Sequence, residues 1–104
     1  MKSKEFEKKI KELGFNYVIQ LEDENEGLVV EYARDDARQT VLCTSNHARY
    51  DIDSAWAGFD ALSMKQQDNI FELFYEYTKT PVWDRGIDIK KKDRNYTEYS
   101  IVRD

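Results

Sequence analysis

The segment from Ser63 to Pro81 constrains the fold more than any other, because its start, its faces and its end can all be read from its residues. Ser63 is a favourable N-cap, and Gln66 follows three residues later, a spacing typical of a capping box. Thr80 precedes Pro81, and a residue before proline is disfavoured in the helical region. The pattern therefore predicts an α-helix over residues 63–79.

One side of this predicted helix is apolar over an arc of about 200°, at 100° per residue. The residues on that arc are Met64, Ile70, Phe71, Leu73, Phe74, Tyr75 and Tyr77, with Gln66 and Gln67 as polar exceptions. A helix that is apolar over more than half its circumference must be covered by other elements. We therefore interpret it as the central core helix, lying on a sheet, and expect Phe71 and Phe74 to be nearly fully buried.

The opposite side of the helix carries an acidic line at positions i, i+4 and i+8, formed by Asp68, Glu72 and Glu76. We interpret it as a solvated face.

A first, shorter helix is predicted over residues 3–13, with Ser3 as its cap. Phe6, Ile10 and Leu13 fall on one face. Gly14 stands where a left-handed residue ends a helix, followed by Phe15, which packs back in a Schellman ending.

Alternating apolar residues then predict strands over 15–21, 28–33 and 39–44. In the second of these, Leu28, Val30 and Tyr32 alternate. A fourth strand over 48–53, with Tyr50 and Ile52 inward, is left open. The short connections favour an antiparallel meander.

The rest of the chain predicts an apolar approach to the core helix, one helical turn and a hairpin. Trp56, Phe59 and Leu62 are expected to cover the N-terminal end of the core helix, and residues 81–85 to form the turn. Two alternating runs, around 87–90 and 97–101, flank a polar turn over 91–95. The predicted fold class is α+β in a single domain over 1–104: an N-terminal helix, an antiparallel β-meander of three to four strands, a central core helix packed on the sheet, and a C-terminal β-hairpin.

Composition and the N-terminal residues favour a cytoplasmic location. The 104 residues contain no run of 18 apolar residues, so we expect no transmembrane helix and no membrane partner. The first nine residues are too charged for a signal peptide. Cys43 is the sole cysteine and cannot form an internal disulfide, which fits a reducing compartment.

The net charge of −5 is unevenly distributed. Residues 22–36 contain seven acidic residues and one arginine, whereas residues 1–14 contain five lysines and three glutamates. Phosphate contacts need local positive charge, so we expect no direct nucleic-acid binding. The partner is expected to be a host or phage protein; the acidic segment is suited to a basic one, for which the predicted contact is the connection that carries Glu22, Asp23, Glu24 and Glu26. Asp35 and Asp36 are expected in the next turn, at the opposite end of the sheet, as solvated charge.

The sequence offers little for catalysis or for a metal. Cys43 and His47, with Asp51 and Asp53, could be drawn as a metal cluster, but the paired ligand spacings of zinc sites are absent. No glycine-rich phosphate loop and no serine elbow is present. We interpret Cys43 as structural and His47 as a loop residue, and expect no catalytic residue, metal or cofactor.

The predicted element order also resembles the double-stranded RNA-binding domain, which holds phosphates with lysines at the start of its second helix. Here the corresponding start, residues 63–68, has one lysine and a nearby acid, Lys65 and Asp68. The resemblance is therefore topological only. The basic run over 90–94 is interpreted as a solvated hairpin turn.

A second resemblance rests on short motifs near the start of the chain and at the end of the predicted core helix. They are Lys4-Glu5-Phe6, Lys9-Ile10, Glu12-Leu13-Gly14-Phe15, the run Tyr75-Glu76-Tyr77-Thr78-Lys79-Thr80-Pro81, and Arg85. With the predicted meander, they resemble a loose group of small orphan proteins encoded in prophages of low-GC Gram-positive bacteria. The segment over 86–94 is longer and richer in lysine than in that group. The resemblance implies a small accessory phage protein that acts in the cytoplasm of the bacterial host, and it assigns no active-site residue.

Three functions remain open at this point. The first is a non-enzymatic accessory phage protein that acts by binding a host or phage protein. The second is an acidic inhibitor that mimics nucleic acid and blocks a host nucleic-acid enzyme, such as a defence nuclease. The third is a small enzyme. Self-association of the chain is left open alongside them.

Overall fold

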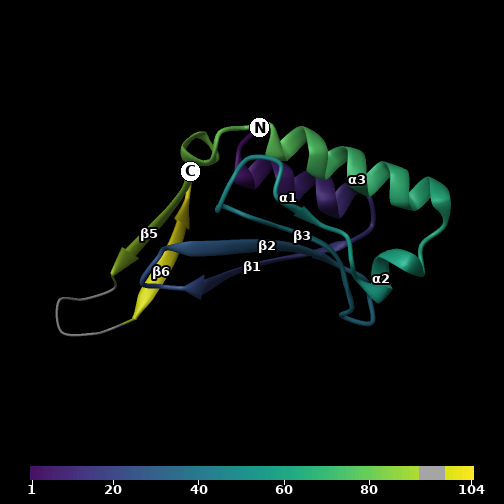
Figure 1. The fold of residues 1–104 in the computed structure, drawn as a ribbon, viewed down its shortest axis with the longest axis horizontal. Helices are drawn as coiled ribbons and strands as arrows, with labels where there is room; N and C mark the ends of the chain where they lie inside the picture. Colours follow the sequence, from purple (N-terminus) through teal and green to yellow (C-terminus); the bar gives the residue numbers. More distant parts are fainter. Residues whose placement is uncertain (92–97) are drawn as a thin grey trace.

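The computed structural model describes residues 1–91 and 98–104 and confirms the predicted α+β architecture (Figure 1). Two main helices cover one face of an antiparallel sheet, and a separate hairpin follows. The helices are α1 (Ser3–Glu12), α2 (Ala57–Asp60) and α3 (Met64–Thr78), with the 3₁₀ turn η1 at Val82–Asp84. The strands are β1 (Asn16–Asp23), β2 (Leu28–Arg34), β3 (Thr40–Ser45), β4 (Ile52–Asp53), β5 (Ile87–Lys91) and β6 (Tyr99–Arg103).

The first four strands form a meander in the order β1-β2-β3-β4, with every neighbouring pair antiparallel. Val18 pairs with Tyr32, which in turn pairs with Cys43. Directly paired residues point to the same face of a sheet, so these three define its outer face, which is turned away from α1 and α3. The inner face is marked by the pair Glu31 and Thr44. Two register shifts, at Leu21/Asp23 and Ala33/Arg34, increase the local twist.

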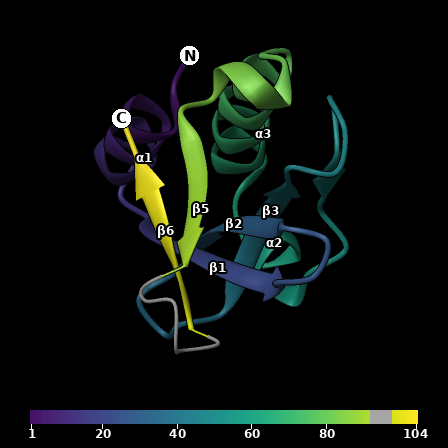
Figure 2. The same cartoon turned by 90° about the vertical axis from the view of Figure 1, so that its left-hand side faces the viewer.

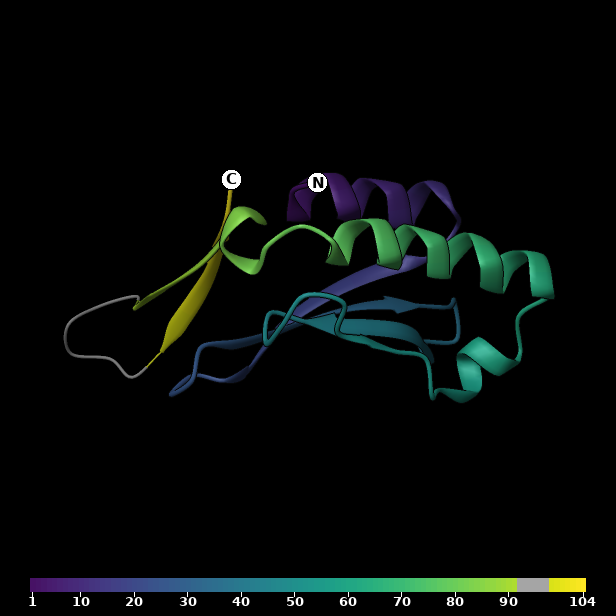
Figure 3. The same cartoon turned by 45° about the horizontal axis from the view of Figure 1, so that its top comes forward.

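The core lies between the inner face and the two long helices, which run side by side above the sheet in Figure 3. The ring of Phe6 on α1 stacks on Tyr77 of α3 at 3.9 Å between centroids and meets Phe74 edge-on at 4.9 Å. These three side chains are fully buried. They join α1 to α3 directly over the sheet.

Helix α1 ends as predicted but begins differently. The amide of Phe15 donates to the carbonyl of Ile10 and that of Gly14 to Lys11, with Gly14 at φ +92°, which is the Schellman arrangement. The predicted cap by Ser3 is wrong, because the N-cap is Lys2 and no side chain caps the helix. Ser3 is buried instead, and its hydroxyl donates to a carboxylate on β2.

Helix α3 has the predicted capping box, in which Ser63 and Gln66 bond reciprocally. The buried sector of its circumference is narrower than the sequence predicts. Phe74 is fully buried, but Phe71 is 40% exposed, so the prediction for Phe71 is wrong. The physical reason is geometric: the main contacts of α3 are with α1, β3 and β4, which together cover the sector of Ile70, Phe74 and Tyr77. Leu73 is half-buried against the core, and the other apolar residues of the arc, Met64, Phe71 and Tyr75, are exposed.

The segment between β3 and α3 also departs from expectation. The sequence left open whether residues 48–53 form a fourth strand, and in the structure only residues 52–53 do. Tyr50 is 47% exposed rather than inward. Tyr50 takes a left-handed φ of +61°, and its amide donates to the carbonyl of Thr78, which draws this loop to the end of α3. Gly58 in α2 packs so closely on the backbone of Thr40 that an added Cβ would lie 2.4 Å from its carbonyl oxygen.

The C-terminal hairpin pairs β5 with β6 and forms a second sheet of its own. Figures 1 and 2 show it extending from the end of the molecule where both chain termini lie. Of the predicted polar turn over 91–95, Lys91 belongs to β5 and the remainder lies outside the described residues, as does Thr97.

Candidate functional site

A buried carboxylate, Glu31, is the centre of a polar cluster that draws side chains from several elements. It projects from the inner face of β2 and is 3% exposed. Its Oε2 accepts hydrogen bonds from Ser3 at 2.8 Å and from the phenol of Tyr17 at 2.5 Å. Its Oε1 accepts one from the phenol of Tyr77 at 2.6 Å. One carboxylate therefore joins α1, β1, β2 and α3.

Two arginines lie close to these phenols and supply positive charge. Arg103 of β6 lies over the ring of Tyr17, 5.1 Å from its centroid, and pairs with Glu7 at 2.6 Å. Arg85, fully buried after η1, lies 5.0 Å from the ring centroid of Tyr77. Arg85 also donates to three backbone carbonyls, those of Thr80, Ser45 and Thr78.

The electrostatics keep the two phenols as donors. Burial, together with the negative charge of Glu31, raises the pKa of Tyr17 and Tyr77 well above the ordinary value for tyrosine. Both therefore stay protonated at neutral pH and donate to the carboxylate. Each Glu31 oxygen is already occupied by an internal donor and withdrawn from solvent. The arrangement is suited to holding elements together rather than to acting on a substrate.

The sequence pattern did not reveal this cluster. It drew attention to Leu28, Val30 and Tyr32 in the second strand, whereas the structure turns Val29, Glu31 and Ala33 to the helices. The available signal was weak: Glu31 occupies the middle of an otherwise apolar alternation with Val29 and Ala33. Its partners lie up to 46 residues away in the sequence.

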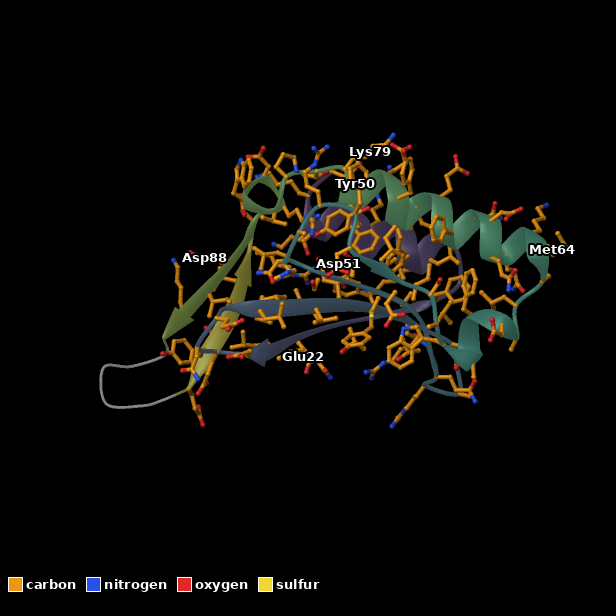
Figure 4. All side chains as sticks on the ribbon, in the orientation of Figure 1. Glu22, Tyr50, Asp51, Met64, Lys79 and Asp88 are labelled. Carbon is orange, nitrogen blue, oxygen red and sulfur yellow. The ribbon has the colours of Figure 1, made fainter. Side chains whose placement is uncertain are left out.

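The predicted contact residues are brought together around the β1–β2 turn, but they have different roles. Glu22 lies on the outer side of the sheet, away from the helices (Figure 4), and accepts from the phenol of Tyr32 at 2.7 Å. Asp23 accepts from the amides of Asn25 and Glu26 and so holds the turn in shape. Glu24 and Glu26 are exposed. Asp35 and Asp36 follow β2 in the next turn, at the other end of the sheet.

The outer face contains a groove that the sequence did not predict. We call it the outer groove; among its lining residues are Glu22, Val30, Tyr32, Cys43, Asp51, Asp53 and Trp56. Three carboxylates therefore meet two aromatic rings on the side of the sheet away from the long helices. Ser45 donates to Asp51 at the edge of this groove.

The cysteine and histidine considered as metal ligands have separate surroundings. Cys43 is buried beneath the outer groove, and this burial raises its thiol pKa to about 11. His47 is exposed in the loop after β3. Across residues 1–91 and 98–104, no three His, Cys, Asp or Glu side chains are grouped so as to hold a metal ion.

Several large apolar side chains are exposed on the helix side of the molecule. Met64 is 80% exposed and Trp83, in η1, is 79% exposed. Phe71 and Tyr75 on α3 are about as exposed as Tyr50, whose ring lies 5.8 Å from that of Tyr75. Figure 4 shows Tyr50 and Lys79 together at one end of α3 and Met64 at the other. Lys79 lies 4.6 Å from the ring centroid of Tyr75.

Comparison with known proteins adds no relative: no protein-family model matches the sequence, and neither the curated proteins nor the solved structures contain a significant match. None of the helices formed by the described residues is long and apolar enough to cross a membrane.

Proposed function

We propose that this chain is a non-enzymatic accessory phage protein that acts by binding another protein. The observation that carries the proposal is the exposure of Met64, Phe71, Tyr75 and Trp83 on the helix side. Large aromatic side chains dominate the energetics of protein interfaces, and exposed ones such as Phe71 and Tyr75, one helical turn apart on α3, are typical of a binding surface. The phage assignment is supported by the motifs at residues 4–15 and 75–85.

The buried cluster supports binding over catalysis. Glu31 is buried, and both of its carboxylate oxygens are occupied by the hydroxyls of Ser3, Tyr17 and Tyr77. A general acid or base needs hydrogen-bond access to the substrate proton that it transfers. Glu31 has no such access while these bonds are made, so we assign it to stability.

Affinity capture tests the proposal. The tagged protein is incubated with lysate of a low-GC Gram-positive bacterium, with and without its prophages, beside a variant carrying Trp83→Ser and Met64→Ser. We expect one host or phage protein to be enriched at near-stoichiometric amounts by the parent chain. Enrichment of the chain itself alone would indicate self-assembly. If the folded protein captures no protein in amounts above those bound by the empty resin, the proposal is contradicted.

A second candidate function is an acidic inhibitor of a host nucleic-acid enzyme. It is favoured by the continuity of negative charge from the exposed Glu24 and Glu26 to Glu22, Asp51 and Asp53 in the outer groove. Such a surface would occupy a basic cleft and would accelerate association with it.

This candidate makes a kinetic prediction. Changing Glu22, Asp23, Glu24 and Glu26 to Gln or Asn removes four charges, and Asn at position 23 keeps the acceptor that holds the turn. We expect the free energy of unfolding to change by no more than about 0.5 kcal/mol. Association with a captured nuclease should become slower, and its rate should depend less on salt concentration. An unchanged association rate and salt slope would refute the acidic contact and leave protein binding as such intact.

A further inference from the structure

We propose that the groove between α2 and α3 is the docking site for a cationic amphipathic helix of the partner protein. This inference rests on the proposed protein-binding function and names the partner segment that the surface fits. We call it the α2–α3 groove; it is lined by Phe59, Gln67, Asp68, Phe71, Glu72 and Tyr75.

The floor of the groove is an apolar stripe along α3. Phe71 and Tyr75 are one helical turn apart and are 40% and 43% exposed. Met64 lies seven residues before Phe71 and therefore falls on the same side of the helix. From Met64 to Tyr75 the stripe is about 16 Å long at 1.5 Å per residue, and the polar residues Gln67 and Asp68 occupy the turn between Met64 and Phe71. A stripe of this length suits a second helix lying alongside α3, with apolar side chains seated between its ridges.

The walls of the groove are fixed before any partner arrives. Gly58 seats α2 directly on the backbone of β3, which fixes the position of Phe59 beside it. The side-chain amide of Gln67 donates to the carbonyl of Phe59 at 2.9 Å and ties α2 to α3. Binding to a preformed groove avoids the cost of ordering it.

The rim of the groove determines the charge of the occupant. Asp68 and Glu72 stand beside Phe71, and neither takes part in an ion pair among the residues that the structure describes. Glu76, one turn further on, is paired with Lys79 at 3.1 Å and contributes less. An apolar floor beside two unpaired carboxylates is complementary to a helix with apolar residues on one face and lysine or arginine at its edge.

A designed peptide tests this directly. The probe is a labelled 14-residue helix of leucine and lysine with all leucines on one face, compared with a peptide of the same composition in scrambled order. Because any basic peptide is attracted to a protein of net charge −5, two variants with equal charge change are compared. Asp68→Asn with Glu72→Gln alters the rim, and Glu24→Gln with Glu26→Gln alters the β1–β2 turn.

We expect the amphipathic peptide to bind about tenfold more tightly than the scrambled one, a difference of about 1.4 kcal/mol. The variant with Asp68→Asn and Glu72→Gln should lose most of this difference in affinity between the two peptides. The variant with Glu24→Gln and Glu26→Gln should keep it. Equal binding of both peptides, or equal losses in both variants, overturns the proposal. Phe71→Ser with Tyr75→Ser, checked for folding by circular dichroism, should abolish the preference. If a natural partner is captured equally well by this folded variant, the α2–α3 groove is not its docking site, while the proposed protein-binding function stands.

Discussion

Single residues explain both the successes and the failures of prediction in this chain. Gln66 and Gln67 stood out as polar side chains on an apolar face. The structure uses Gln66 in the capping box and Gln67 to hold α2. The cap could be predicted because its partner, Ser63, is three residues away. The role of Gln67 could not, because the carbonyl of Phe59 is brought to it only by the packing of α2.

Glu31→Ala tests the buried cluster at the residue scale. The substitution leaves the hydroxyls of Ser3, Tyr17 and Tyr77 without their acceptor and removes the charge opposite the nearby arginines. Removing one partner of a buried charged network costs about 3–5 kcal/mol. We expect this loss in the free energy of unfolding measured with urea, and a change near zero for Glu24→Ala in the exposed turn. Similar unfolding of the two variants would show that Glu31 is not a structural centre.

Cys43 provides a second residue-scale prediction. Its burial raises the thiol pKa to about 11, so about one thiol in a thousand is ionised at pH 8. Only the thiolate reacts with alkylating reagents. We expect iodoacetamide to label the native protein roughly 100-fold more slowly than the urea-unfolded protein at that pH. Equal rates in the two states would mean that the outer groove exposes Cys43.

At the scale of elements, the order of the main helices and strands was predictable, as were the C-terminal end of α1 and both ends of α3, because local residues encode them. The Schellman ending at Gly14 and Phe15 needs only six residues of sequence. How far around its circumference each helix is covered was not predictable. The width of the covered sector depends on how the sheet twists beneath α3, and a single sequence does not specify this.

A pair of substitutions on α3 tests which part of its circumference is covered by the rest of the protein. Phe74 is fully buried and contacts Phe6, whereas Phe71 is 40% exposed. We expect Phe74→Ala to cost about 3–5 kcal/mol of unfolding free energy through cavity formation. Phe71→Ala should cost about 1–2 kcal/mol, because less apolar surface returns to water. Thermal unfolding of both variants against the parent makes the comparison. Equal losses would place Phe71 in the core after all.

At the scale of the whole molecule, the chain is a helix-covered sheet with a hairpin attached through its polar cluster. Arg103 of β6 reaches Ser3, Tyr17 and Glu7 on α1 and β1. These contacts connect residues up to 100 positions apart. Sequence periodicity could predict that a hairpin exists, but not which residue attaches it to the body.

Arg103→Ala tests this attachment. We expect hydrogen exchange at the β5–β6 backbone to accelerate more than tenfold, because the hairpin loses its charged contacts with the body and opens locally. Exchange in α3 and the meander should stay close to that of the parent chain. Lys90→Ala, an exposed position on the same hairpin, is the matched control. Uniform acceleration over the whole chain, or none in the hairpin, contradicts this role.

Site-specific photo-crosslinking in cells tests the central claim, that the chain works by binding a protein through its exposed aromatic helix face. A benzoylphenylalanine is placed at Phe71 or Tyr75 in the α2–α3 groove, and at Lys8 on the exposed side of α1 as the control. We expect one discrete crosslinked product from positions 71 and 75 and none from position 8. Folded protein that crosslinks to no other protein from either groove position, or equally from all three positions, would contradict it.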